Sequence, residues 1–474
     1  MKFRSILILA VFTPFLFTAP EVAHGAPKPV MVHYMPWFVS QPYSGSWGWH
    51  WTMLHFNPNV LNANGQQEIA SWYYPLIGPY DSADPVVLEY HVLLMKLAGI
   101  DGVIVDWYGM DNFNDYAVNN QRTLALFNYT RKAGLKFSLC YEDATIKQET
   151  NGFITASAAI SHAQQTMLYV QTNFFTDASF LRLSNAPVLL NFGPQYFYNS
   201  SDWTSIFSVL NVTNQPAFFT EDNRLSPVGT GAFDWPPMSG GTLTPAQLQS
   251  YLVSFDQKAG GWPGFVSSAF PRFHDIYAQA GVGSSYGYLD DANGSTLTNT
   301  LSRAMTNNSA IVQIVTWNDF GEGTIVEPTR EYGYRDLGII QDFRRQYTDA
   351  NFSYHTNDLA MAFRFYNLRK QYGNSPAISA ELNRIFTNIV STAVSTADLQ
   401  LTGIESNKPV IYNLSYDGVQ LRFLIGGYVA SSVLVQMSTN LTTWQTVQTF
   451  AASTNLPVFS TSTAQAVCRF FKIQ

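Results

Sequence analysis

The chain has few cysteines, few charged residues and few long apolar runs, and each shortage excludes a class of protein. Its 474 residues include only two cysteines, Cys140 and Cys468, with no cluster of histidines beside them. The usual ligand spacing of a zinc site is therefore missing, and a disulfide between two different predicted domains is not expected. Charged residues make up 12% of the chain against 46% hydrophobic residues. This balance excludes a disordered protein and indicates a sizeable core.

Several binding and catalytic motifs are missing as well. No glycine-rich phosphate loop joins a predicted strand to a helix, and no Ser-His-Asp order indicates a nucleophilic triad. The formal net charge is −7, and a mildly acidic chain is a poor binder of nucleic acid. Outside the N-terminus, no segment reaches the roughly 18 apolar residues of a spanning helix. We therefore expect no nucleic-acid partner, no membrane contact for the mature protein, no metal or organic cofactor, and a monomer.

The N-terminus has the pattern of a secretory signal peptide. Lys2 and Arg4 give it a basic start, an apolar stretch follows over 6–17, and residues 23–25 are mostly small. The apolar stretch is too short to span a bilayer comfortably, which favours cleavage over anchoring. Residues 1–25 are therefore predicted to be a signal peptide, and the mature protein to be secreted or periplasmic.

Short apolar runs alternate with amphipathic stretches over most of the chain. The eight runs that we predict to be strands are 28–38, 99–109, 135–143, 186–197, 215–222, 231–237, 264–275 and 310–324. Two of the stretches between them have apolar residues at helical spacing and a glycine at the end. Eight buried strands alternating with helices predict an α/β fold, a (β/α)8 TIM barrel.

Polar and aromatic residues gather at the C-terminal ends of seven of these runs. They include Tyr34 and Trp37, Asp106 and Trp107, Glu142, Glu221, Asp234, Asp275 and Asp319. In such a barrel these ends meet on one face, where the active site lies.

The pattern changes after about residue 345. Two helical stretches, 357–373 and 377–394, are followed from about 400 by alternating strands and polar turns. We predict a small antiparallel β-sandwich. The expected domains are thus a catalytic barrel at 26–397 and a β-sandwich accessory domain at 398–474.

The last predicted strand run, 310–324, ends in a turn that contains two carboxylates, Asp319 and Glu322, and two glycines, Gly321 and Gly323. Two acids that face one pocket are what glycoside hydrolysis requires, because one protonates the leaving oxygen while the other acts as base or nucleophile. The competing interpretation is structural: one acid caps the next segment or pairs with an arginine such as Arg335. The place of the two acids at a strand's C-terminal end favours catalysis.

Three blocks of sequence resemble glycoside hydrolase family 99, the endo-α-1,2-mannosidases and mannanases. The longest is QQEIASWYYPLIGPYDSADPVVLEYHVLLMKLAGIDGVIVDWYG at 66–109, which is similar to the family's I-A-S-x-Y-Y-P block and the strand after it. HYMPWF at 33–38, with His50-Trp51, resembles its first strand, and TWNDFGEGTIVEP at 316–328 resembles its acidic turn.

Two departures from that family concern the acidic turn. Asp319 stands where the mannosidases have Glu, and Gly321 stands where they have His. The run TWNDFGE is closer to the W-N-D-Y-G-E turn of the α-1,3-glucanases of family 71. The chain therefore resembles the combined family 71/99 group. These departures leave mannose specificity open but keep both acids.

The resemblance implies a secreted, endo-acting hydrolase of an α-linked glycan, with α-mannan favoured. By position, Glu322 would be the general acid and Asp319 the base. The base would take either the sugar's own 2-hydroxyl proton, as understood for the mannosidases, or a water proton, as understood for the inverting glucanases. An α-1,3-glucanase, or a carbohydrate-binding barrel without catalysis, remains the alternative.

Nine further residues are predicted to bind substrate. They are Tyr34, Trp37, His50, Trp51, Asp106, Trp107, Glu142, Asp275 and Glu327. The aromatic residues would stack on sugars, or they would simply pack in the core or at the barrel rim. Glu142 matches a family glutamate that contacts substrate, with a structural ion pair as the alternative. Glu327 matches the second glutamate of the family turn, where it would either contact substrate or support the residues that do.

Overall fold

The computed structural model describes residues 28–474 except 151, 153, 428–431, 452–456 and 464–468. The predicted signal peptide at 1–25 and Cys468 lie outside the described residues. Among the described residues, no helix combines the length and the apolar character needed to cross a bilayer.

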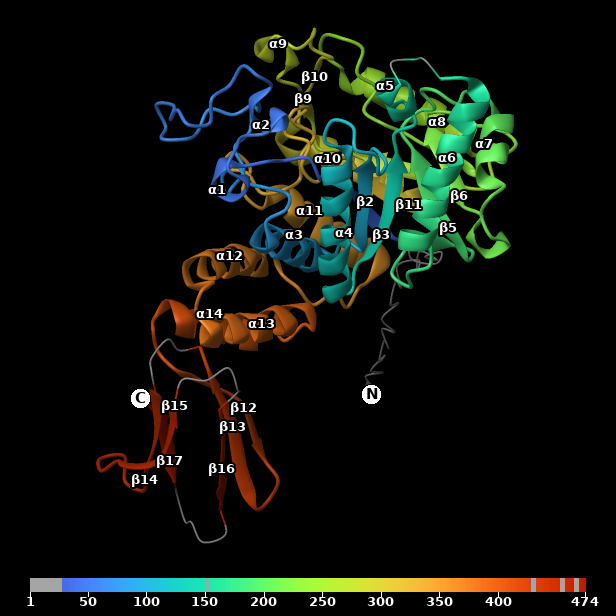
Figure 1. Ribbon diagram of the computed structural model, residues 1–474. Helices are drawn as coiled ribbons and strands as arrows, with labels where there is room; N and C mark the ends of the chain where they lie inside the picture. The colour runs from blue at the N-terminus through green and yellow to red at the C-terminus, as the bar shows by residue number, and fades with distance from the viewer. Residues whose placement is uncertain (1–27, 151, 153, 428–431, 452–456, 464–468) are drawn as a thin grey trace, which may run out of the picture.

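Eight parallel strands close into a barrel, which confirms the predicted TIM-barrel fold (Figure 1). Their order around the barrel is β3-β2-β1-β11-β8-β7-β6-β5, and pairing of β3 with β5 closes it. The strands are β1 (Val30–Tyr34), β2 (Gly102–Trp107), β3 (Lys136–Tyr141), β5 (Ala186–Asn191), β6 (Ala217–Glu221), β7 (Gly231–Phe233), β8 (Val266–Ala269) and β11 (Ile311–Ile314). Each lies inside one of the eight predicted runs.

Helices surround the barrel, and short elements form its rim. They are α1 (Gln41–Ser44), α2 (Trp49–Thr52), α3 (Pro85–Ala98), α4 (Tyr116–Lys132), α5 (Thr145–Glu149), α6 (Ala156–Val170), α7 (Ser200–Phe207), α8 (Pro245–Ala259), α9 (Tyr277–Ala280), α10 (Ser295–Thr306) and α11 (Arg335–Phe343). Short strands are β4 (Arg182–Leu183), β9 (Phe273–His274) and β10 (Tyr288–Leu289). The helix α3 shows why these bounds arise: the Asp84 carboxylate accepts from Val86 N, Pro85 opens the helix, and Gly99 ends it at a φ of +79°.

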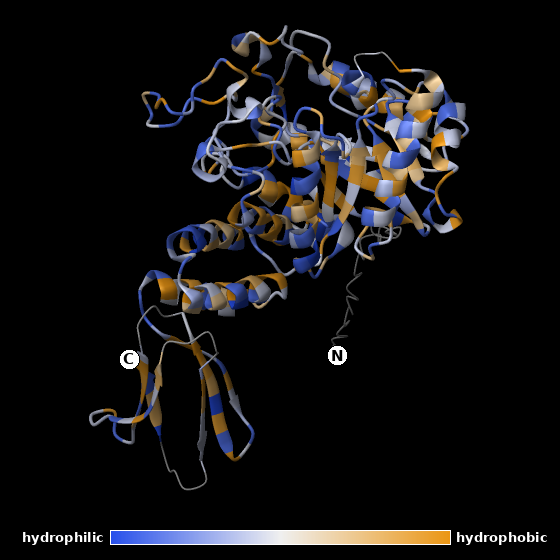
Figure 2. Ribbon diagram, in the orientation of Figure 1, coloured by the Kyte–Doolittle hydropathy of each residue, from blue (hydrophilic) through white to orange (hydrophobic). Residues whose placement is uncertain are grey.

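The strands carry apolar residues on both faces, as Figure 2 shows, because one face lines the barrel and the other packs on helices. The interior contains Met31, Ile104, Cys140 and Phe219. Successive side chains of a strand point to opposite faces, so the residue two places after an interior position also points inward. By this rule, the side chains of Asp106 and Glu221 point toward the barrel axis at the C-terminal end of the barrel strands.

Three helices and two small sheets follow the barrel. The helices are α12 (Ala360–Tyr372), α13 (Pro376–Val390) and α14 (Val394–Glu405), and α12 and α13 pack on α3. One sheet has the order β12-β13-β16 and the other β15-β14-β17. Their strands are β12 (Val410–Tyr416), β13 (Gln420–Gly426), β14 (Ser432–Ser438), β15 (Gln445–Ala451), β16 (Val458–Ser462) and β17 (Phe470–Ile473). The predicted antiparallel sandwich is confirmed, with a core that includes Phe423 and Phe459.

The sandwich attaches to the helical layer through close backbone contacts. Gly427 N donates to the buried Glu381 carboxylate at 2.9 Å. A side chain at Gly403 of α14 would lie 2.6 Å from the Gly427 carbonyl oxygen. The predicted boundary at 398 falls within α14, a helix that the sequence did not indicate, and β16 was also not predicted.

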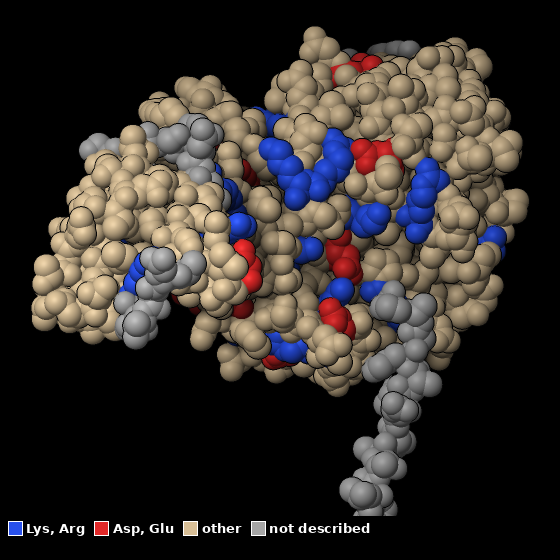
Figure 3. All heavy atoms as spheres, turned by 90° about the horizontal axis from the view of Figure 1, so that it is seen from below, with Lys and Arg blue, Asp and Glu red and all other residues tan. Residues whose placement is uncertain are grey.

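The lower end of the barrel carries charged side chains of both signs. Figure 3, which views the molecule from below, shows Lys and Arg side chains with Asp and Glu side chains among them on the face opposite the rim helices α2, α5 and α9. Lys136 at the start of β3 and Arg182 at the start of β4 belong to this lower end. The inward-pointing carboxylates Asp106 and Glu221 lie at the upper end.

Candidate active site

The turn after β11 holds its two acids on a tightly bonded backbone. Thr316 Oγ1 accepts a hydrogen bond from Asp319 N at 2.8 Å, and Asp319 Oδ1 accepts one from Glu322 N at 3.0 Å. Gly323 N donates to the Asp319 carbonyl at 2.9 Å. Gly323 has a φ of +69°, and a Cβ there would lie 2.8 Å from the His274 carbonyl oxygen. Only glycine fits at this position without strain.

This acid turn, residues 319–323, is also bonded to the segment that follows β8. His274 N donates to the Glu322 carbonyl at 2.8 Å, and Ile276 N donates to the Gly321 carbonyl at 3.0 Å. The alternative of a structural ion pair with Arg335 is not observed, because Arg335 pairs with Asp291 and Asp336. The acids are thus fixed through main-chain contacts.

Gly321 leaves little room for a larger residue. A Cβ there would lie 3.1 Å from Met53 Cε, 3.4 Å from Asp319 Oδ1 and 3.7 Å from Tyr277 Cε1. A histidine, as in the similar family 99 turn, would require Met53 to move. Met53 and Tyr277 therefore occupy space beside the acids that another side chain takes in those relatives.

Asp319 and Glu322 differ in their proton affinity. Burial raises the pKa of Asp319 to about 6, against the lowering effect of hydrogen bonds from the Glu322 and Gly321 amides. Burial also raises the pKa of Glu322 well above its usual range, and the negative charges of Asp319, Asp275, Glu221 and Asp106 raise it further. Burial and neighbouring like charges thus favour the protonated form of Glu322, whereas the amide hydrogen bonds to Asp319 favour its ionised form.

Three more carboxylates face the same space from the ends of other strands. Burial raises the pKa of Asp106 to about 7, and the charge of Asp319 contributes. Burial and then the charge of Asp106 raise the pKa of Glu142 well above its usual range. Burial and the charge of Asp222 raise the pKa of Glu221 to about 7. Asp106 Oδ1 is buried without a protein hydrogen-bond partner, so it is available to a ligand hydroxyl.

Trp37 and His50 form an aromatic wall at the mouth of the barrel. Their rings stack in parallel, with centroids 4.1 Å apart, and Tyr108 lies 6.2 Å from Trp37. Both side chains are half-buried. Burial and the charge of Arg122 lower the pKa of His50 to about 3, so the imidazole is neutral. A neutral flat wall of this kind suits the apolar face of a sugar ring.

Three predicted aromatic contacts are corrected by the structure. Trp51 is fully buried against Phe38 and donates to the Tyr80 carbonyl, and Trp107 is fully buried and donates to Asn120. Tyr34 is 1% exposed. None of the three rings can stack on a sugar, because each is enclosed by neighbouring side chains.

Glu327 is also buried and does not offer a contact for substrate. It belongs to a buried polar network behind the acid turn. Its carboxylate accepts from Tyr80 Oη at 2.7 Å and lies 3.2 Å from His91 Nε2. His91 Nδ1 in turn lies 3.0 Å from Tyr34 Oη. Tyr80 Oη also accepts from Asn318, the residue before Asp319, whose amide oxygen accepts from Met35 N. The network therefore joins β1 to the acid turn.

Asp275 was predicted to contact substrate, but in the structure its carboxylate anchors a loop. Its Oδ2 accepts from Ser285 Oγ at 2.8 Å, from Tyr286 N at 2.7 Å and from Gly287 N at 3.3 Å, and its Oδ1 accepts from Tyr277 N. Both oxygens are thus occupied by the loop 275–287.

That loop borders a cavity of about 770 Å³ lined by Trp49, Tyr277 and Tyr286. Trp49 is 43% exposed and Tyr286 54% exposed. Tyr286 packs edge-on against Tyr277, whose ring lies beside Gly321 of the acid turn. Tyr277 therefore lines this cavity and also lies beside the acid turn, and the cavity has two accessible aromatic rings.

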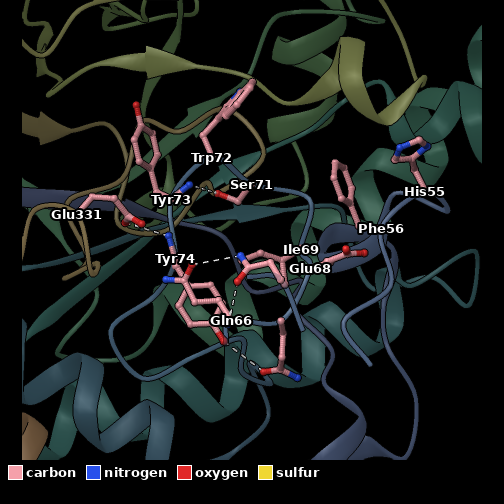
Figure 4. Close-up of a pocket in the computed structure, with 12 residues that line it drawn as sticks. His55, Phe56, Gln66, Glu68, Ile69, Ser71, Trp72, Tyr73, Tyr74 and Glu331 are labelled. Atoms are coloured by element: carbon pink, nitrogen blue, oxygen red, sulfur yellow. Dashed lines mark hydrogen bonds between the residues drawn. The ribbon is translucent and has the colours of Figure 1, made fainter. Parts of the chain in front are cut away.

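A second cavity, of about 420 Å³, is lined mainly by residues of the 66–109 block, among them Trp72 and Tyr74, together with Glu331 (Figure 4). Trp72, 40% exposed, stacks on His274 at 4.4 Å and donates to the Asp275 carbonyl. Glu331 Oε2 accepts from Tyr74 N at 3.0 Å. This part of the 66–109 block thus packs along the segment that supports the acid turn.

Four residues near the acids were not predicted as site residues: Tyr108, Gln195, Glu221 and Tyr277. Gln195 Nε2 donates to Glu142 Oε2 at 3.3 Å. Glu221 was detectable, because it ends a predicted strand in the same way as Asp106. Tyr277 gave no sequence signal, since it belongs to a four-residue helix inside a loop.

Comparison with known proteins confirms the resemblance to family 99. The sequence model of glycosyl hydrolase family 99 matches residues 27–215. The chain is 21% identical over 352 residues to a glycoprotein endo-alpha-1,2-mannosidase-like protein of Danio rerio, covering 66% of this chain and 74% of that one. It is 22% identical over 321 residues to a glycoprotein endo-alpha-1,2-mannosidase of Mus musculus, covering 62% and 66%.

Among solved structures, the GH99 endo-alpha-mannosidase from Bacteroides thetaiotaomicron matches with a TM-score of 0.50 and 18% identity. The match covers 72% of this chain and 99% of that one. At this identity the match shows a shared barrel fold. Together, the family and sequence matches confirm that the chain is similar to family 99 and that its enzyme class is glycoside hydrolase.

Proposed function

We propose that this glycoside hydrolase is an endo-acting enzyme that cleaves α-linked mannan or a related α-linked glycan, with Glu322 as general acid and Asp319 as base. The observation that carries the proposal is that one fixed turn holds two buried acids in different surroundings. Neighbouring negative charges favour the protonated form of Glu322, which suits donation to the leaving oxygen. Amide hydrogen bonds favour the ionised form of Asp319, which suits acceptance of a proton.

The surrounding carboxylates support this division of roles. Each negative charge near Glu322 makes loss of its proton less favourable, so the neighbouring carboxylates favour the protonated form that a general acid needs. Asp106 and Glu142 also offer acceptors for sugar hydroxyls, and the Trp37–His50 wall offers a flat apolar surface. The endo mode is supported by the open cavity beside Tyr277, which leaves room for sugar units beyond the reacting one.

α-1,3-Glucan is the second candidate substrate, and one observation favours it. The similar mannosidases have histidine between their two acids, whereas this chain has Gly321, and a histidine here would require Met53 to move. The contacts that such a histidine would make to a mannose unit are therefore missing from this turn.

The test is the release of reducing ends from purified α-mannan and from α-1,3-glucan. The wild type is compared with Glu322→Gln and with a matched control, Asp342→Asn, whose side chain is 76% exposed on α11. We expect activity on α-mannan, a loss of about 10²–10⁴-fold in Glu322→Gln, and no change in the control. Activity on glucan alone would move the assignment to the second candidate.

Binding of either polymer without release by the wild type would instead indicate a carbohydrate-binding barrel. The anomeric configuration of the first product, measured by NMR, distinguishes between the two ways in which Asp319 could act as a base. Retention follows if the base takes the 2-hydroxyl proton, and inversion follows if it activates water.

Secretion is part of the same proposal and rests on the basic, apolar and small-residue order of residues 1–25. Expression of the full chain in a secreting bacterium, with N-terminal sequencing of the exported protein, should give a mature chain that starts near residue 26. Retention of an intact Met1 in the exported fraction would contradict this part of the proposal.

A further inference from the structure

Three potential metal ligands from three separate segments meet on the rim of the barrel, apart from the acid turn. Asp111 lies in the loop after β2, Glu149 is the last residue of α5, and His162 lies in α6. His162 Nε2 is 3.3 Å from Asp111 Oδ2 and 3.4 Å from Glu149 Oε2. The three ligand atoms lie within 4.8 Å of one another.

We propose that Asp111, Glu149 and His162 form a binding site for a divalent transition-metal ion, and that zinc fits it best. Imidazole and carboxylate donors suit zinc, whereas calcium and magnesium favour sites made of oxygen alone. Three protein ligands leave a fourth tetrahedral position for water. The side chains are 30%, 32% and 10% exposed for His162, Asp111 and Glu149, so an ion and a water molecule can enter.

The distances support a shared ion over a simple ion pair. Zinc lies about 2.0–2.2 Å from nitrogen and oxygen donors, which at tetrahedral angles places neighbouring donors roughly 3.3–3.5 Å apart. Both distances from His162 Nε2 match this separation. A charged hydrogen bond from imidazolium to carboxylate would be shorter, about 2.7–2.9 Å. The geometry is that of ligands arranged around a common centre.

The orientation of the histidine ring agrees with this interpretation. His162 Nδ1 is buried and has no protein hydrogen-bond partner among the described residues. Nε2 is the ring atom that faces both carboxylates. A cation between Asp111 and Glu149 would offset the repulsion between their like charges.

A bound ion would connect two segments that carry residues of the candidate active site. The loop of Asp111 follows Asp106 and Tyr108, and the helix of Glu149 follows Glu142. Zinc would hold these segments together at the rim and limit their motion. This role is structural and does not depend on which glycan the enzyme cleaves.

The sequence did not indicate this site. The three ligands are 38 and 13 positions apart, and the expectation of no metal rested on the missing cysteine and histidine spacing. Only the folding of two consecutive strand-to-helix connections against α6 brings the ligands together.

The test uses the full chain without a histidine tag, because a tag would bind the same ion. After treatment with EDTA and dialysis, zinc chloride is titrated into the protein by calorimetry, and bound zinc is counted by elemental analysis. We expect one zinc per chain and a higher melting temperature with zinc than without it. His162→Gln and Glu149→Gln should each weaken zinc binding at least tenfold.

His55→Gln serves as the matched control, because His55 is an exposed histidine that packs on Phe56 outside the cluster. It should bind zinc as the wild type does. Equal zinc binding by the wild type and both cluster variants would overturn the proposal and leave an ion pair. Tighter binding of calcium than of zinc would overturn the choice of metal. If His162→Gln does not fold, Glu149→Gln decides alone.

Discussion

Glu322 and Glu327 are five residues apart on the same segment, yet their surroundings are opposite. Glu327 accepts a hydrogen bond from Tyr80 and lies 3.2 Å from His91, so its neighbours are polar groups and not other carboxylates. Glu322 faces Asp319, Asp275, Glu221 and Asp106, so its charge is opposed. A buried carboxylate with partners supports the fold, whereas one surrounded by like charges holds a proton for chemistry. The difference separates a structural acid from a reactive one without reference to relatives.

The largest effect should come from exchanging each acid for its amide. Glu322→Gln should lower kcat by about 10²–10⁴-fold and leave the melting temperature unchanged or raised, because a buried acid among like charges is removed. Glu327→Gln should lower the melting temperature, with a cost of about 1–3 kcal/mol, because a bonded buried group is altered. Activity assays and thermal unfolding measure the two variants. A similar stability loss in both would contradict the comparison.

Gly323→Ala should disturb the turn that holds the reactive acid. The φ of +69° and the 2.8 Å approach to the His274 carbonyl both oppose a Cβ. We expect a stability loss of about 1–2 kcal/mol or more and a clear fall in kcat, with KM less affected. Urea unfolding and steady-state kinetics give the two quantities. The control is Gly281→Ala, also at positive φ but with no atom within 4 Å, which should lose stability while keeping kcat.

Asp106→Asn tests whether neighbouring charges keep Glu322 protonated. The profile of kcat/KM against pH should have an acidic limb near pH 6 from Asp319 and an alkaline limb from Glu322. Removing the negative charge at 106 lowers the pKa of Glu322, so the alkaline limb should move to lower pH. An unmoved alkaline limb, with activity retained, would show that these charges do not act on Glu322.

The same substitution should alter how stability depends on pH. The pKa of Asp106 is raised to about 7 in the folded protein, from an ordinary value of 3.8. The folded state therefore binds more protons than the unfolded state, and this contribution to stability is lost as pH rises from about 4 to 7. In Asp106→Asn, the melting temperature should fall less over this range than in the wild type. An unchanged slope would contradict the raised pKa.

The smallest effect should come from the exposed aromatic rings of the cavity beside Tyr277. Trp49→Ala and Tyr286→Ala should lower kcat/KM on long glycans by about tenfold each, since one stacked ring contributes roughly 1–1.5 kcal/mol. Activity on a short aryl glycoside should stay the same. Leu54→Ala, a change of a side chain that is 90% exposed, is the control. Equal losses on short and long substrates would show that the rings act on the acids and not on distant sugar units.

The barrel could be predicted from the sequence because its strands are continuous apolar runs. Each of the eight runs contained a strand, and the acids at their ends converge because parallel strands share one end. The helix α14 was missed because its sequence, VSTADLQLTGIE, contains several residues of low helix propensity, including Gly403, and shows little amphipathic pattern.

The side-chain environment of the site was less predictable. Trp51 and Trp107 were expected to line the site but are enclosed, whereas Trp49 and Tyr286 are accessible and were not singled out. Trp49 and Trp51 belong to the same short helix, α2, yet only Trp51 is enclosed, so local sequence does not show which ring other segments will cover. Asp275 ends a predicted run as Asp106 does, yet its oxygens are occupied by the loop after it. These outcomes depend on packing between segments far apart in the chain.

The carboxylate of Asp275 closes the loop 275–287 at its base, since it gathers the amides at both ends. The residues between these anchor points, 278–284, are mostly exposed. Segment 278–284 is in this sense an exchangeable part: its length and side chains could change during evolution without altering the backbone bonds that His274 and Ile276 make to the acid turn. New glycan preferences could therefore arise on this barrel by replacing one short segment while the acids stay in place.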